Sequence, residues 1–128
     1  MKLLLDTHAL LWWLNDDPSL GSKARGLIGD DANHVCISVA SLWEMAIKVR
    51  IGKLQSDLEK IFSAVSAQGI RIIDIRPSHL SVLTRLPRHH RDPFGLMMVA
   101  QAMVEGATLM TSDRNITLYP GVFIRCSD

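Results

Sequence analysis

The sequence predicts an α/β layer fold with a mainly parallel sheet of four to five strands. Short apolar runs of strand length alternate along the chain with helical segments, which is typical of parallel α/β folds. The 128 residues suffice for one substantial hydrophobic core, so a single domain over residues 1–128 is expected. With 48% hydrophobic and 21% charged residues, the composition indicates a compact globule and not a disordered segment.

The first elements follow from apolar runs and the residues that interrupt them. Lys2–Leu5 has the pattern of a buried parallel strand. Thr7–Leu14 is predicted as a strongly apolar helix, which the Asp-Asp-Pro turn at 16–18 ends. A second, amphipathic helix is expected over Ser19–Ile28, with the serine as its N-cap, and His34–Ile37 is predicted as the second strand.

The middle of the chain repeats the strand–helix pattern. Ser38 is predicted to cap a helix that runs to about Lys48, because apolar residues follow it at helical spacing. Asp57–Gln68 shows the same periodicity, and Gly69 ends it. Arg71–Ile75 is predicted as the third strand.

The last two helices each begin with a proline, whose missing N–H costs nothing at the first helical position. One is predicted over Pro77–Leu86, and Pro93 opens the other and most apolar one, Phe94–Glu105. Thr108–Thr111 and Val122–Ile124 are predicted as the fourth and fifth strands.

Charge and cysteine content narrow the functional classes. The net charge is +1, so any affinity for RNA must come from local clusters of basic residues. Cys36 and Cys126 are too few and too far apart for a disulfide framework or a zinc site. The N-terminal apolar run is broken by Asp6 and His8, which fits neither a signal peptide nor a membrane span. A cytoplasmic protein is therefore expected.

Three acids follow the predicted strands in a way that indicates a metal site. Asp6 follows the first strand, Asp113 follows the fourth, and Glu44 lies in the helix after the second. Ligands of open parallel sheets bind beyond the carboxyl ends of the strands. Carboxylates brought together there repel one another unless a cation lies between them. Oxygen-only ligation suits Mg²⁺ or Mn²⁺, which serve phosphoryl chemistry by activating water and neutralising charge.

Each acid also has a structural interpretation. Asp6 is a suitable N-cap for the helix that begins at the next residue. Ser41 and Glu44 match a capping box, although a helix start at residue 38 would leave the glutamate facing the site. Asp113 suits a turn, and Asp92 before a proline is a good N-cap, which is the favoured interpretation for that residue.

The densest basic segment is a candidate for binding RNA phosphates. It contains Arg88, His89, His90 and Arg91, directly before the last helix. Lys48, after Glu44, would extend that surface. A solvated loop, and cations that complement a helix dipole, are the structural alternatives.

Four short blocks, in order and spanning nearly the whole chain, carry a resemblance to a known family. They are Leu4–His8 with Leu11–Leu14; Ser38–Lys48 continuing to Gly52–Leu54; Leu86–His90, Asp92–Phe94 and Val99–Ala102; and Leu109–Asp113. Together they resemble the VapC-type toxins, PIN-domain ribonucleases of bacterial type II toxin–antitoxin pairs.

The resemblance implies a three-layer α/β/α fold and a Mg²⁺- or Mn²⁺-dependent endoribonuclease. Family members are held inactive by a cognate antitoxin and commonly form homodimers. Asp6, Glu44 and Asp113 match acids of the family's metal site. Trp12 and Trp13 lie in a helix that is apolar on every side, which fits either contact with another chain or core packing.

One position departs from the family pattern. The third block usually reads Asp-Pro-Phe-Asp-Arg, but Gly95 and Leu96 stand where the second Asp and the Arg are expected. Asp92, about one helical turn earlier, is a candidate substitute ligand. The alternative function is therefore a catalytically impaired PIN-domain protein that retains antitoxin or RNA binding. A phosphoacceptor or phosphatase is disfavoured, because Asp6 lacks the second acid that such sites use.

Overall fold

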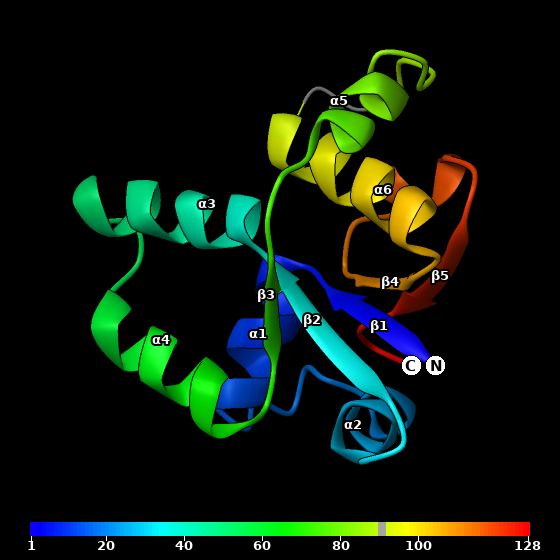
Figure 1. Cartoon of the computed structure of the whole chain (residues 1–128). Coiled ribbons are helices and arrows are strands. Elements are labelled where there is room, and N and C mark those ends of the chain that lie inside the picture. Colours follow the sequence, from blue (N-terminus) through cyan, green and yellow to red (C-terminus); the bar gives the residue numbers. More distant parts are fainter. Residues whose placement is uncertain (90–91) are drawn as a thin grey trace.

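The computed structural model describes residues 1–89 and 92–128 and contains one five-stranded sheet flanked by helices (Figure 1). The strands are β1 (Lys2–Leu5), β2 (His34–Ser38), β3 (Arg71–Ile73), β4 (Thr108–Thr111) and β5 (Val122–Arg125). The helices are α1 (Thr7–Leu14), α2 (Ser22–Gly29), α3 (Val39–Arg50), α4 (Leu58–Ala67), α5 (Pro77–Leu83) and α6 (Pro93–Glu105), with a short 3₁₀ helix η1 (Ile116–Leu118). The predicted α/β class is confirmed.

The sheet is parallel throughout, with the strand order β3-β2-β1-β4-β5. The first strand of the chain is therefore the central one, and the order reverses there, because β2 lies on one side of it and β4 on the other. Such a reversal leaves a crevice beyond the carboxyl ends of the two strands, where open α/β sheets bind their ligands. The topology places this crevice after Leu5 and Thr111.

Alternate residues of β1 face two separate apolar layers. Leu3 and Leu5 belong to a core shared with α1, α2 and α4, whereas Leu4 packs with α6 on the other face. Figure 1 shows α5 and α6 on one side of the sheet and α2 and α4 on the other. The three-layer α/β/α arrangement is thus confirmed. In the part of the chain that the structure describes, no helix is long and apolar enough to cross a membrane.

Helix α2 begins three residues later than predicted, and Ser19 does not cap it. The N-cap is Gly21, whose backbone N–H donates to the carbonyl oxygen of Cys126 at 2.8 Å. The N–H of Ala24 donates to the backbone oxygen of Asp128 at 3.1 Å. Backbone from after β5 thus satisfies the first turn of α2, in place of a side chain.

Strand β3 and helix α5 are both shorter than predicted. β3 ends at Ile73, not at residue 75, because its partner Ser38 is the last residue of β2 before α3 begins. α5 ends at Leu83, not at residue 86, and the chain closes it with a turn in which the N–H of Arg85 donates to the carbonyl of Val82 at 3.0 Å. The helix starts at Pro77 and Pro93 and the Gly106 terminus agree with prediction.

Candidate active site

Asp6 links the end of β1 to the turn after β4. Its Oδ1 accepts a 2.7 Å hydrogen bond from the Ala9 N–H and so caps α1. Its Oδ2 accepts a 2.9 Å bond from the Ser112 N–H. The residue is only 4% exposed, and burial raises the pKa of its carboxyl, although the two backbone donors partly oppose this. The structural role predicted for Asp6 is confirmed, and it lies in the crevice as well.

Glu44 projects from α3 toward the start of α1. Because Ser38 caps α3, Glu44 is not part of a capping box with Ser41. The Thr7 hydroxyl donates to Glu44 Oε1 at 2.6 Å, and the Lys48 ammonium lies 3.3 Å from Oε2. The carboxylate is therefore held between α1 and a cation on its own helix.

Asp113 and Asp92 also combine a local structural role with a place near the crevice. Asp113 Oδ1 accepts a 2.9 Å bond from the Asn115 N–H in the turn after β4. Asp92 Oδ1 accepts a 3.0 Å bond from the Phe94 N–H and caps α6. The structural interpretations of both acids are thus confirmed.

The four carboxylates line one pocket of about 440 Å³ at the carboxyl ends of β1 and β4. Its full lining comprises Asp6, Thr7, His8, Glu44, Asp92, Met98, Ser112, Asp113, Arg114 and Ile116. Within residues 1–89 and 92–128, however, no three carboxylate, imidazole or thiol groups lie close enough to hold a metal ion as they stand. The predicted acids therefore share one pocket, but they do not lie close enough together to form a ligand cluster.

The donors of this carboxylate pocket fit Mg²⁺ or Mn²⁺ by their chemistry. Besides His8 and Arg114, the ionisable residues of its lining are four carboxylic acids, and hard divalent cations prefer carboxylate oxygens as ligands. Glu44 is already neutralised by Lys48, so an ion at this site would take the place of the ammonium group.

Position 95 lies beside the same pocket, although the buried Gly95 is not itself part of the lining. A Cβ atom built on Gly95 would lie 3.6 Å from Asp92 Oδ2 and 3.1 Å from the Ile116 Cδ1 atom, and both of these residues line the pocket. An acidic side chain at 95 would therefore lie next to Asp92 at the pocket, whereas the glycine adds no ligand there.

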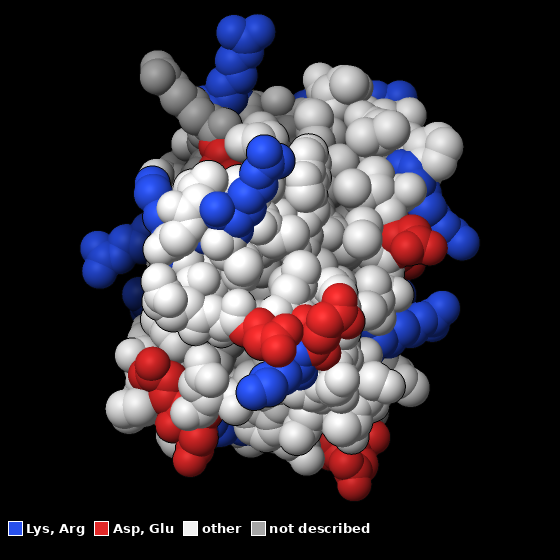
Figure 2. Space-filling view, turned by 90° about the vertical axis from the view of Figure 1, so that its left-hand side faces the viewer, with Lys and Arg blue, Asp and Glu red and all other residues white. Residues whose placement is uncertain are grey.

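The basic residues predicted to bind RNA are only partly described. Arg88 is exposed, and Lys48 contacts Glu44, while His90 and Arg91 lie outside the described residues. Viewed from the side of α3 and α4, Lys and Arg predominate on the upper half of the surface, and most acidic side chains lie lower (Figure 2). On this face of the nearly neutral chain, positive and negative charges are thus unevenly distributed.

Several pocket residues were not predicted from the sequence. Thr7 orients Glu44, the Ser112 N–H holds Asp6, and Arg114 adds a cation to the lining. Thr7 directly follows a predicted acid, and Ser112 and Arg114 flank Asp113. Adjacency to predicted acids at strand ends is the signal that would have identified them.

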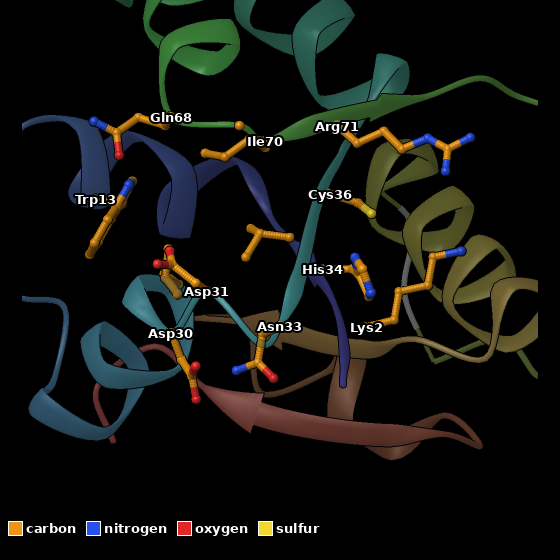
Figure 3. Close-up of a pocket in the computed structure, with 13 residues that line it drawn as sticks. Lys2, Trp13, Asp30, Asp31, Asn33, His34, Cys36, Gln68, Ile70 and Arg71 are labelled. Carbon is orange, nitrogen blue, oxygen red and sulfur yellow. The ribbon is translucent and has the colours of Figure 1, made fainter.

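A larger cavity of about 640 Å³ lies at the opposite edge, around the amino ends of β1, β2 and β3. Figure 3 shows Lys2, His34, Cys36 and Arg71 on one side of β2 and Trp13 on the other. None of the four acids of the carboxylate pocket lines this larger cavity. Ligand sites of open α/β sheets lie beyond the carboxyl ends, so the smaller pocket is the better candidate.

Fold and pocket together define an α/β protein with carboxylates at the topological switch point of a parallel sheet. The PIN domain family model matches residues 3–121. The chain belongs to the PIN domain family, as the resemblance of its sequence blocks predicted.

Solved structures support the same fold. The chain is similar to the VapBC2 complex of Rickettsia felis bound to a promoter DNA fragment, with 19% identity, a TM-score of 0.72 and 98% of each chain covered. It is also similar to VapBC-1 of nontypeable Haemophilus influenzae, with 14% identity, a TM-score of 0.65 and 100% coverage of both chains. A domain of a functionally unknown protein from Methanocaldococcus jannaschii has a TM-score of 0.57 at 18% identity, covering 99% of this chain and 93% of that one. No curated protein sequence matches significantly.

Proposed function

We propose that the protein is a Mg²⁺- or Mn²⁺-dependent endoribonuclease and the toxin of a toxin–antitoxin pair. The observation that carries this proposal is the gathering of four carboxylates, from four separate segments, in one pocket at the switch point of a PIN domain. Repulsion among these acids favours a bound cation, and the pocket is open to a polymeric substrate.

In this proposal Asp6, Glu44 and Asp113 would hold the ion, and Asp92 would contribute in place of the acid missing at position 95. When bound, a divalent ion neutralises charge on the phosphate and lowers the pKa of a water molecule. The chain's own residues do the positioning: the Ser112 N–H orients Asp6, and the Thr7 hydroxyl orients Glu44.

The RNA strand is proposed to follow the basic side of the pocket. Arg114 lines the pocket itself, and Arg88 is exposed on the loop before α6. His90 and Arg91 are proposed to contact the RNA because of the basic sequence pattern around them. Lys48 is proposed as well, because a metal ion bound by Glu44 would release its ammonium group. Phosphate contacts of this kind position a strand without reading its sequence.

The proposed partners are a cognate antitoxin and a second copy of the chain. Two structural relatives are named VapBC, and the sequence blocks resemble the VapC-type toxins. A cytoplasmic location, shared with RNA and the antitoxin, belongs to the same proposal.

A second candidate function follows from one position. Gly95 lies next to Asp92 and provides no ligand, so the protein would keep its PIN fold and its partner while losing cleavage. Tight antitoxin binding without RNA cleavage at saturating Mn²⁺ is the result that this candidate requires.

Cleavage of RNA with Mg²⁺ or Mn²⁺, with and without EDTA, tests the main proposal. Glu44→Gln keeps an acceptor for the Thr7 hydroxyl but removes the charge, and it is expected to lower kcat roughly a hundredfold. Glu59→Gln, an exposed acid on α4, is the matched control. Cleavage that resists EDTA and is equal in both variants would contradict the assignment.

A further inference from the structure

Beside the carboxylate pocket lies a smaller cavity with a different chemical lining. It measures about 220 Å³ and is lined by Trp12, Ser112, Asp113, Arg114, Arg125 and Ser127. Three of these residues, Ser112, Asp113 and Arg114, also line the carboxylate pocket. The two cavities therefore share part of their walls; we refer to the pair as the cleft and to the smaller cavity as the Trp12 subsite.

One wall of the cleft is aromatic and comes from a single face of α1. His8 lines the carboxylate pocket, and Trp12, four residues later, lines the Trp12 subsite. Their ring centroids lie 5.7 Å apart with planes inclined by 48°. Residues four apart are neighbours on a helix, so the rings continue one another along the cleft.

The remaining lining of the Trp12 subsite is cationic and polar. Arg114 and Arg125 are both exposed. Arg125 lies 3.8 Å from the Asp128 carboxylate, and both side chains are well exposed, so this ion pair is weak and its guanidinium can turn toward a ligand. Ser112 and Ser127 stand beside these cations.

From this arrangement we infer that the Trp12 subsite binds the nucleotide next to the scissile phosphate in an unpaired stretch of RNA. The base lies against the Trp12 indole, and the adjoining phosphate contacts Arg114 and Arg125. This inference rests on the proposed nuclease function and adds to it the residues that hold the nucleotide beside the cleaved phosphate.

Size and chemistry both favour this occupant. At about 220 Å³ the subsite is smaller than the roughly 300–1,000 Å³ of sites that enclose a whole small ligand, which suits one unit of a longer chain. An aromatic wall beside arginines is how proteins hold unpaired nucleic acid, because a base must leave its stack to lie on a side chain.

RNA binding by fluorescence anisotropy tests the inference, with a labelled single-stranded octamer and the same octamer in a duplex. Measurements use the Glu44→Gln background, so that the RNA is not consumed. Trp12→Leu is expected to weaken single-strand binding roughly tenfold, and Trp12→Phe is expected to retain most of it. Arg125→Gln is expected to weaken binding. It should also make the slope of log affinity against log salt concentration shallower by about one.

Matched controls come from the opposite edge of the sheet. Trp13→Leu removes the neighbouring half-buried indole, and Arg71→Gln removes an arginine, both of which line the cavity at the amino ends of the strands. Equal losses in test and control variants, or equal affinity for single strand and duplex, would overturn the inference. A thermal melt of each variant separates lost binding from lost folding.

The design also separates this inference from the proposed function. If the native protein cleaves RNA while the Trp12 and Arg125 variants bind RNA normally, the assignment of the Trp12 subsite is wrong and the proposed nuclease function stands. If the variants lose RNA binding while the native protein cleaves nothing, the subsite stands and the nuclease function falls. Loss of antitoxin binding with RNA binding unchanged would assign the subsite to the protein partner and overturn the inference.

Discussion

At the carboxyl end of β1, one carboxylate holds together two distant parts of the chain. Asp6 receives the Ala9 N–H of α1 on one oxygen and the Ser112 N–H on the other. Both bonds favour the charged form, while burial disfavours it and raises the pKa of the carboxyl. The N-cap of α1 and the proposed metal ligand are thus the same residue, and its local role fixes its position in the pocket lining.

At position 95, restoring an acid should strengthen metal binding. Gly95→Asp directs a carboxylate past a Cβ position 3.6 Å from Asp92 Oδ2, while the flexible end of Ile116 must move by a few tenths of an ångström. We expect Mn²⁺ affinity, measured by isothermal titration calorimetry, to rise at least about tenfold, with faster RNA cleavage.

Gly95→Ala is the control for that prediction, because it meets the same Ile116 contact without adding a ligand. Unchanged Mn²⁺ affinity in the aspartate variant would show that position 95 does not reach the ion.

Glu105 forms a second polar cluster, far from the carboxylate pocket. Its carboxylate lies 3.2 Å from the Lys2 ammonium and 3.1 Å from Nε2 of the fully buried His79. The hydrogen bond from Lys2 is the largest influence and lowers the pKa of Glu105, with a smaller contribution from His79. The cluster ties α6 to β1 and α5.

Because the pKa of Glu105 is lowered, this residue is expected to make the stability of the protein depend on pH. A carboxyl whose pKa is lowered on folding stabilises the protein above its unfolded pKa of about 4.3, and this stabilisation is lost as the pH falls through the folded value. Glu105→Gln should therefore lower the Tm by a few degrees at pH 7 and by progressively less below about pH 4. A difference in Tm that stays constant from pH 7 to pH 3 would contradict this account.

Among the elements, α2 differs from its neighbours in how it starts. Ser38, Asp57 and Asp92 cap their helices with side chains close in sequence, and these three starts could be predicted from local patterns. The backbone acceptors of α2 come from residues 126–128, so no local pattern could identify Gly21 as its N-cap. The early end of β3 was missed for a similar reason, since its partner strand decides it.

Gly21 and Gly26 should respond in opposite directions to alanine. A Cβ on Gly21 would lie 2.0 Å from the Asp128 backbone oxygen, whereas a Cβ on the exposed, helical Gly26 meets nothing within 4 Å. Gly21→Ala should lower the free energy of unfolding by about 1–3 kcal/mol. Gly26→Ala should raise it by up to about 1 kcal/mol through helix propensity. Urea denaturation measures the free energy of unfolding of both variants. Similar values for the two would contradict the contact between residues 126–128 and the start of α2.

For the whole molecule, the alternation of strands and helices sufficed to predict the layers, and the strand ends sufficed to predict that Asp6 and Asp113 lie at the crevice. The strand order was not predictable, because short apolar strands carry little information about their neighbours. Pairing of β1 with β4 brings Asp6 and Asp113 to one pocket. The remaining distances depend on hydrogen bonds such as Thr7 to Glu44, which link residues 37 apart.

The strand order predicts that the central strand resists local unfolding more than the edge strands do. Leu3, Leu4 and Leu5 of the central strand are fully buried and pair on both sides, whereas β3 and β5 are edge strands with exposed residues such as Ile72 and Val122. In native-state hydrogen exchange, β1 amides should require global unfolding, and edge amides should exchange through smaller openings. Faster exchange in β1 than in β3 would contradict this order.

The hydrogen bond from Ser112 to Asp6 also bears on how the protein folds. It joins residues 106 positions apart, and closing so long a loop precedes any gain from the contacts it makes. Sheets built from such distant pairings fold slowly, and here the central strand β1 precedes its partner β4 by about a hundred residues. We therefore expect the carboxylate pocket to be among the last features to form, so that a partly folded chain would carry these acids without bringing them together.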